Sequence, residues 1–295
     1  MRSRSGTFRL GILFVVAVFL LSNFLGCQGY RIVHQVRSPF QLITVVDTSN
    51  GFRRLILDGR LDGSDPIQSE MNLSKPRDLS LSYTRAMMAA LPLADHHRRI
   101  LLVGLGGASM QKFLHDLLPE TVLETVEIDP EVVRVARRFF GFEPENNQVV
   151  HVGDGRAFIE NSRKRYDIIF LDAYGHDTIP FSLATLEFLE AVRDRLSEGG
   201  VVCANLLTGN PHYWDMVKTY SEVFRDFHMI KPPGSGNAIL FAPLGRTGLT
   251  TESWAWEAAA FDEESPTELE LPRLIRRHRE NRLKIPEQAK VLRDK

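Results

Sequence analysis

LLVGLGGAS, residues 101–109, is an apolar run that passes into a cluster of glycines and then into a helical pattern. The apolar half has the composition of a buried strand. Glycine has no Cβ, so the backbone at Gly104 and Gly106 can turn sharply and approach a ligand closely. Glycine turns also end ordinary strands, so the residues that follow are needed to tell whether this turn binds a ligand. We predict a strand, a tight turn and a helix, with both glycines beside a bound nucleoside.

An acidic residue follows the glycine turn at the separation typical of ribose binding. The next apolar run ends at VEID, residues 126–129, so Glu127 lies about 20 residues beyond the glycines. A side chain at this place accepts hydrogen bonds from ribose hydroxyls. A purely structural carboxylate between Val126 and Ile128 would be costly unless it were paired. We therefore predict that Glu127 binds the ribose.

Two further apolar runs also end in aspartates. One leads to GDG, residues 153–155, and the next leads to Asp172. The carboxyl ends of parallel strands meet at one edge of a sheet, where ligands bind. We expect Glu127, Asp154 and Asp172 to converge on one cleft, with Asp154 near the adenine amino group.

The middle of the chain alternates β-rich runs with helical patterns, which predicts βαβ units in a parallel sheet with helices on both faces. The expected strands lie at residues 99–103, 121–128, 148–152, 167–171 and 201–206. Two more runs flank PPGSG, residues 232–236, and predict a closing antiparallel hairpin. We predict an α/β fold with a Rossmann-like sheet of the S-adenosylmethionine-dependent methyltransferase type.

Composition and motif spacing argue against several classes of function. The 36 Lys and Arg residues nearly balance the 37 Asp and Glu residues, and there is no long basic run, so we expect a small substrate and no nucleic acid. Ser109 stands where a dinucleotide-binding motif has its third glycine, which disfavours a dehydrogenase. The histidines lack the spacing of metal ligands, so we expect no metal.

The first 28 residues have the features of a targeting signal. Arginines precede an apolar run over residues 10–25, the layout of a signal peptide or a short membrane anchor. The run is marginal for a full span, which takes about 20 residues. FLGC, residues 24–27, is similar to the lipobox of bacterial lipoproteins, so lipidation of Cys27 and an uncleaved anchor both remain open. We expect membrane association through this segment, on a side that the sequence leaves undetermined.

Three segments follow the targeting segment. Residues 29–75 predict a small β-strand region and a loop: residues 30–58 are rich in β-branched and aromatic residues and predict strands, and residues 59–75 have little periodicity and predict the loop. Residues 76–245 hold the motifs described above and predict a Rossmann-like nucleoside-binding catalytic domain. Residues 246–295 alternate acidic and basic stretches and predict a polar, solvated appendage. Cys203 lies within an apolar run, where we expect a buried and inert thiol.

Several short motifs carry a resemblance to a known family: SPFQ at 38–41, LDG at 57–59, YTRA at 83–86, GDGRAF at 153–158 and DAY at 172–174. Together with the glycine turn they are similar to the spermidine synthase family of polyamine aminopropyltransferases, over about residues 33–243. The likeness is strongest to a divergent bacterial branch that is often fused to membrane transporters. The resemblance implies transfer of an aminopropyl group from decarboxylated S-adenosylmethionine to a small amine. It also implies a homodimer, because family members often assemble through their N-terminal strands.

The resemblance further implies roles for individual residues. Asp172 is expected to be the catalytic carboxylate, which accepts a proton from the attacking amine. Tyr83 is expected to line the acceptor tunnel. The residues expected to hold the nucleoside are Gln41, Glu127, Asp154 and Gly155.

Three positions depart from the family pattern. Gly107 stands where an aspartate usually follows the glycines, and Thr84 stands where a histidine follows the tyrosine. Gly175 replaces a second acidic residue after Asp172, and Asp177 is the substitute that we expect to bind substrate. The nucleoside half is therefore kept better than the polyamine half. Two alternatives stay open: a methyltransferase that uses intact S-adenosylmethionine, and a non-catalytic, membrane-tethered binding protein of the same fold.

Overall fold

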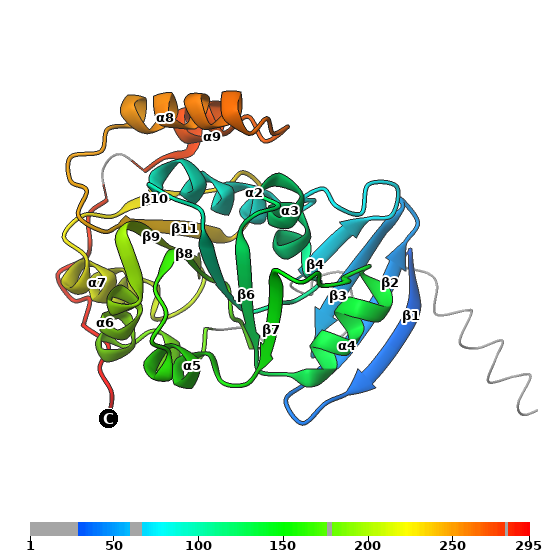
Figure 1. Cartoon of the computed structure of the whole chain (residues 1–295). Coiled ribbons are helices and arrows are strands. Elements are labelled where there is room, and N and C mark those ends of the chain that lie inside the picture. The colour runs from blue at the N-terminus through cyan, green and yellow to red at the C-terminus, as the bar shows by residue number, and fades with distance from the viewer. Residues whose placement is uncertain (1–28, 60–66, 176–178, 281–282) are drawn as a thin grey trace, which may run out of the picture.

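The computed structural model describes residues 29–59, 67–175, 179–280 and 283–295. Cys27 and Asp177 lie outside the described residues. The chain forms a four-stranded sheet and a seven-stranded sheet, and helices cover both faces of the larger one (Figure 1). No helix within the described ranges is long and apolar enough to cross a membrane.

The N-terminal sheet is antiparallel throughout, and its strands pair in chain order. They are β1 (Tyr30–Arg37), β2 (Leu42–Thr48), β3 (Phe52–Leu57) and β4 (Ile67–Asn72). The turn between β2 and β3 needs a positive φ, which Gly51 supplies at 84°. The sheet packs on helix α4 (Pro130–Phe139), where Val45 and Val132 share one buried cluster. The prediction of a small β-region before the main sheet is confirmed. The loop predicted over residues 59–75 was partly wrong, because residues 67–72 form β4 and pair with β3.

The larger sheet has five parallel strands: β5 (Arg99–Val103), β6 (Val122–Glu127), β7 (Gln148–Val152), β8 (Tyr166–Leu171) and β9 (Leu196–Leu207). Antiparallel β10 (His228–Ile230) and β11 (Asn237–Pro243) complete the order β10-β11-β9-β8-β5-β6-β7. Because β5 lies between β6 and β8, the winding direction reverses there, which is where such sheets open a ligand crevice. The predicted Rossmann-like sheet with its closing hairpin is confirmed.

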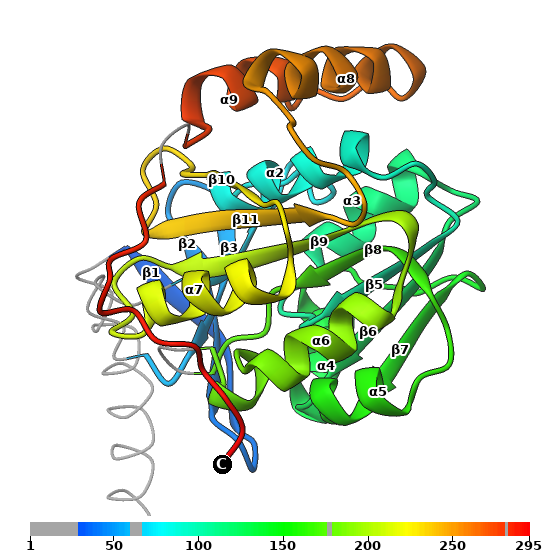
Figure 2. The same cartoon turned by 90° about the vertical axis from the view of Figure 1, so that its left-hand side faces the viewer.

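Each face of the larger sheet has its own core, because successive strand residues point to opposite faces. Leu101 and Val202 pack on one face, which is covered by α5 (Gly155–Asn161), α6 (Leu186–Asp194) and α7 (Tyr213–Val223) (Figure 2). Leu102 and Cys203 pack on the other face, which is covered by α2 (Ser82–Met87), α3 (Ser109–Leu117), α8 (Thr251–Glu264) and α9 (Leu271–His278). Two short helices, η2 (Met88–Leu93) and η3 (Phe181–Leu183), complete the described elements.

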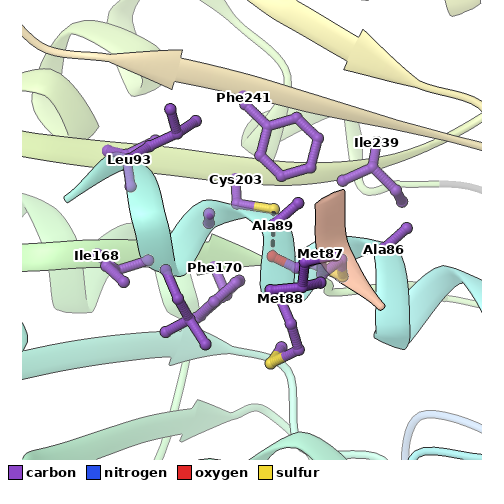
Figure 3. Packing of buried hydrophobic residues seen from close by; sticks show 14 of the residues in the cluster. Ala86, Met87, Met88, Ala89, Leu93, Ile168, Phe170, Cys203, Ile239 and Phe241 are labelled. Atoms are coloured by element: carbon purple, nitrogen blue, oxygen red, sulfur yellow. Dashed lines mark hydrogen bonds between the residues drawn. The ribbon is translucent and has the colours of Figure 1, made fainter. Parts of the chain in front are cut away.

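The thiol of Cys203 lies in the centre of one of these cores. It is fully buried beneath Phe241, and its sulfur lies 3.7 Å from the carbonyl oxygen of Met87 (Figure 3). Burial raises the pKa of Cys203 well above its usual range, so the thiolate does not form at neutral pH. The prediction of a buried thiol is confirmed.

The segment after residue 246 is not solvated as expected. Trp254 of α8 is fully buried against Phe241, and its indole nitrogen donates to the carbonyl oxygen of Ala89 at 3.1 Å. Ile275 of α9 is also fully buried. The expectation of a solvated appendage was wrong, because the charged composition of the segment as a whole conceals a buried face on each helix. The buried residues are Trp254, Ala255, Ala258 and Phe261 on α8 and Leu271 and Ile275 on α9.

Candidate active site

A cavity of about 340 Å³ opens at the carboxyl ends of the central strands, between the two sheets. Eight of the nine site residues expected from the sequence line it: Gln41, Tyr83, Gly104, Gly106, Glu127, Asp154, Gly155 and Asp172. The ninth, Asp177, lies outside the described residues. The expected convergence of the strand-end carboxylates on one cleft is therefore observed.

Neighbouring protein atoms leave no room for a side chain at either glycine of the turn. Gly104 has φ 103°, and a Cβ there would lie 2.4 Å from the carbonyl oxygen of Asp172. Gly106 has φ 53°, and its Cβ would lie 2.6 Å from the hydroxyl of Ser69 on β4. A side chain at either position would displace the residue it contacts, Asp172 or Ser69, so only glycine fits this part of the cavity wall.

Glu127 ends β6 and is hydrogen-bonded within the turn. One carboxylate oxygen accepts from the Leu105 amide and the other from the Asp129 amide, both at 3.0 Å. Burial raises the pKa of Glu127, and these two amide donors oppose the rise. A carboxylate has about four acceptor positions, so it retains capacity for two hydroxyl donors from the cavity.

Asp154 and Gln41 are both held by local hydrogen bonds. Asp154 is the N-cap residue of α5, and its Oδ1 accepts a hydrogen bond from the Ala157 amide at 2.8 Å. Gln41 Nε2 lies 3.4 Å from Oδ2 of Asp129, which also accepts from Ser38. Sequence reasoning did not single out Asp129, although an aspartate before a proline at a helix start is a recognisable N-cap signal.

Asp172 follows β8 and is held from two sides. Asn205 Nδ2 donates to Oδ1 at 2.8 Å, and the Tyr83 hydroxyl lies 3.4 Å from Oδ2. Burial raises the pKa of Asp172 to about 7, while these two donors act in the opposite direction. Asp172 is thus a carboxyl group on the cavity wall that changes charge near neutral pH.

Asn205 itself is fixed by a further hydrogen bond. Its side-chain oxygen accepts from Asn237 Nδ2 at 2.8 Å, so its amide nitrogen is directed at Asp172. The Tyr174 hydroxyl donates to the backbone oxygen of Asn205. Sequence reasoning missed Asn205; the available signal was an amide residue near the end of the apolar run VVCANLL, residues 201–207.

Gly107, where the family pattern has an aspartate, leaves no space for a side chain. A Cβ there would lie 2.9 Å from the Phe140 ring and 3.0 Å from Cβ of Ser69. The Gly107 amide donates to the Ser69 hydroxyl at 2.8 Å. The close packing of β4 and Phe140 against the glycine turn therefore explains why glycine, and not aspartate, stands at position 107.

The cavity wall is acidic. Asp58 joins Glu127, Asp154 and Asp172, and the described lining residues include no Lys, Arg or His. Such a wall attracts cations. In the part of the chain that the structure describes, no group of three or more His, Cys, Asp or Glu residues is arranged to hold a metal ion.

Comparison with known proteins agrees with this geometry. The model of the spermine/spermidine synthase domain matches residues 81–229. The polyamine aminopropyltransferase of Vibrio vulnificus (strain CMCP6) is 35% identical over 237 residues, which cover 79% of this chain and 78% of that protein.

Two solved structures are similar in fold. A probable spermidine synthase from Corynebacterium glutamicum has a TM-score of 0.69 and 21% identity, covering 90% of this chain and 97% of that one. Human methyltransferase-like protein 13 in complex with SAH has a TM-score of 0.56 and 27% identity, covering 70% and 97%. The domain match and the 35% identical relative show that the chain belongs to the spermine/spermidine synthase family.

Proposed function

We propose that this protein is an aminopropyltransferase that uses decarboxylated S-adenosylmethionine and a small amine. The main support is the position of Asp172 on the wall of an acidic cavity, beside the hydroxyl group of Tyr83. Burial there raises the pKa of Asp172 to about 7. A cationic donor and a cationic amine are both attracted by that wall. The relatives named polyamine aminopropyltransferase support the same reaction.

In the proposed reaction the amine nitrogen attacks the propyl carbon next to the sulfonium. The C–N bond forms as the C–S bond breaks, and the sulfur keeps the bonding electrons and leaves in neutral methylthioadenosine. The amine enters as an ammonium ion, so the Asp172 carboxylate first accepts one of its protons, which frees the lone pair that attacks. After the transfer the product nitrogen keeps its two remaining protons and its positive charge. A base with a pKa of about 7 suits this step, because it is substantially ionised at neutral pH and still basic enough to take the proton.

For the donor, we propose that the nucleoside lies across the glycine turn. The ribose hydroxyls donate to Glu127, and the adenine amino group donates to Asp154. The half-exposed Phe40 and Ile128 line the same cavity and provide apolar surface for the purine.

Methyl transfer from intact S-adenosylmethionine is the second candidate, and the similarity to a human methyltransferase favours it. The intact donor has a carboxylate that the decarboxylated donor lacks. The lining residues within the described ranges offer that carboxylate no basic side chain, and four acidic ones repel it. Charge therefore favours the decarboxylated donor.

Calorimetric titration of the full-length chain, purified in mild detergent, with each donor tests this choice. We expect tighter binding of the decarboxylated donor, and loss of that binding in Glu127→Ala. Glu131→Ala is the matched control, because it removes a nearby carboxylate that pairs with Arg134. Tighter binding of the intact donor would favour methyl transfer, and binding of neither would favour the non-catalytic alternative.

We further propose that residues 1–28 attach the protein to a membrane. The support is the sequence pattern of arginines, an apolar run and the lipobox-like FLGC. Cell fractionation of the full chain and of Cys27→Ala tests this. Recovery of the full chain in the soluble fraction would refute attachment, whereas release of only the variant would identify lipidation as the anchor.

A further inference from the structure

The last residues of the sequence form an ordered strap along the helices behind the cavity. In this C-terminal strap, residues 290–295, the Leu292 amide donates to the Thr219 hydroxyl at 3.0 Å and its carbonyl accepts from the Leu186 amide at 2.8 Å. The Leu292 side chain is 8% exposed and belongs to the core that α6 and α7 share. Leu292 therefore anchors the strap to the start of α6.

Asp294, two residues after this anchor, pairs with Arg156 near the start of α5. Both carboxylate oxygens of Asp294 accept from the guanidinium, one of them at 2.7 Å. The hydrogen bond with Asp294 is the largest cause of a raised pKa of Arg156, and the same bond lowers the pKa of Asp294. A bidentate pair of this kind fixes the plane of the guanidinium.

Arg156 in turn connects two walls of the cavity. Its Nη1 donates to the carbonyl oxygen of Ser182 and to the Thr185 hydroxyl, both at 3.1 Å. Its chain neighbour Gly155 lines the cavity on one side, and Ser182 lines it on the other. The guanidinium thus links the start of α5, on the cavity wall, to the segment that contains η3.

A second carboxylate, that of Glu160, also binds the guanidinium, at a different nitrogen. Arg156 Nε already donates to Glu160 at 2.7 Å, one helical turn further along α5. That carboxylate is more exposed than Arg156, and it contacts Nε alone. Asp294, in contrast, accepts from both Nη1 and Nη2, and Nη1 is also the nitrogen that donates to Ser182.

We propose that Asp294 is a positioning residue for the nucleoside site: through Arg156 it holds Ser182 against the cavity. The inference rests on the proposed function, because it assumes that the donor lies between the α5 wall and the η3 loop. Asp294 contacts neither Asp172 nor its hydrogen-bond donors, so it affects donor binding and leaves the chemical step unchanged.

The test compares Asp294→Ala with Glu222→Ala in the full-length chain. Glu222→Ala is the matched control, since it removes an exposed carboxylate paired with Lys218 on α7, away from the cavity. Titration with decarboxylated S-adenosylmethionine should show about fivefold weaker binding for Asp294→Ala. The KM for the donor should rise by a similar factor while kcat stays within about twofold.

The outcomes separate the inference from the proposed function. Equal donor affinity in Asp294→Ala and Glu222→Ala, or a fall in kcat with an unchanged KM, would overturn the role of Asp294. Absence of donor binding by the wild-type chain would refute the proposed function, and the inference with it. If Asp294→Ala unfolds at a lower temperature than the control, Asp294→Asn, which keeps the shape and removes the charge, is compared in its place.

Discussion

Asn205 Nδ2 lies 2.8 Å from Oδ1 of Asp172 and donates a hydrogen bond to it. The Asn205 amide is oriented by Asn237, which donates to its oxygen at 2.8 Å. Burial raises the pKa of Asp172 to about 7, and the hydrogen bond from Asn205 opposes that rise. Asn205 therefore helps to set the pH range in which Asp172 is ionised.

The first prediction is the pH dependence of the wild-type rate. A base must be unprotonated to act, so kcat should rise from pH 6 to pH 8 with a midpoint near 7. Measurement of methylthioadenosine release at saturating donor checks this. A rate that is constant between pH 5 and pH 8 would contradict the role of Asp172 as the base.

Replacement of Asn205 should move that midpoint. Asn205→Ala removes a donor that stabilises the carboxylate, so the midpoint should shift upward by about one pH unit, the equivalent of one hydrogen bond to a charged group. Asn237→Ala should give a smaller shift in the same direction, because it only frees the Asn205 amide to rotate. Asn210→Ala, in the loop after β9, is the control and should leave the profile unchanged.

Asp172→Asn should separate catalysis from stability. Loss of the base should lower kcat by about 10²–10⁴ while the Kd for the donor changes little. The folded-state pKa of Asp172 is raised above the unfolded value, so the folded state binds more protons between about pH 4 and pH 7, and this group's contribution to stability falls as pH rises through that range. The variant should therefore unfold at a higher temperature than wild type at pH 8. A lower unfolding temperature at pH 8 would contradict the raised pKa.

The two tryptophans of α8 offer a direct test of the packing. Trp254 is fully buried, whereas Trp256 is 72% exposed. Trp254→Ala should lower the free energy of unfolding by about 3–5 kcal/mol, because it leaves a cavity against Phe241. Trp256→Ala should change it by less than about 0.5 kcal/mol. Urea denaturation of both variants measures the difference, and similar losses would show that α8 is not docked on the core.

Much of the site could be predicted because its residues lie where local patterns end. Gly104, Glu127, Asp154 and Asp172 each follow an apolar strand run, and parallel strands bring such positions to one edge. The departure at Gly107 was also visible in the sequence. Its physical reason, contact with Phe140 and Ser69, depends on how the two sheets pack and needed the structure.

The missed features depend on contacts between distant parts of the chain. Arg156 and Asp294 are 138 residues apart, and neither has a local pattern that indicates the other. Asn205 meets Asp172 only because β9 lies beside β8. Trp254 lies in a segment whose charged residues outweighed its apolar stripe. Long-range pairing of this kind leaves no periodicity for sequence reasoning to find.

The identity of the nucleoside product tests aminopropyl transfer most directly. The full-length chain would be incubated with decarboxylated S-adenosylmethionine and a series of linear diamines, and the products analysed by mass spectrometry beside Asp172→Asn. We predict methylthioadenosine together with an amine that has gained one aminopropyl group, both greatly reduced in the variant. Turnover of intact S-adenosylmethionine to S-adenosylhomocysteine, with no methylthioadenosine from the decarboxylated donor, would show a methyltransferase instead.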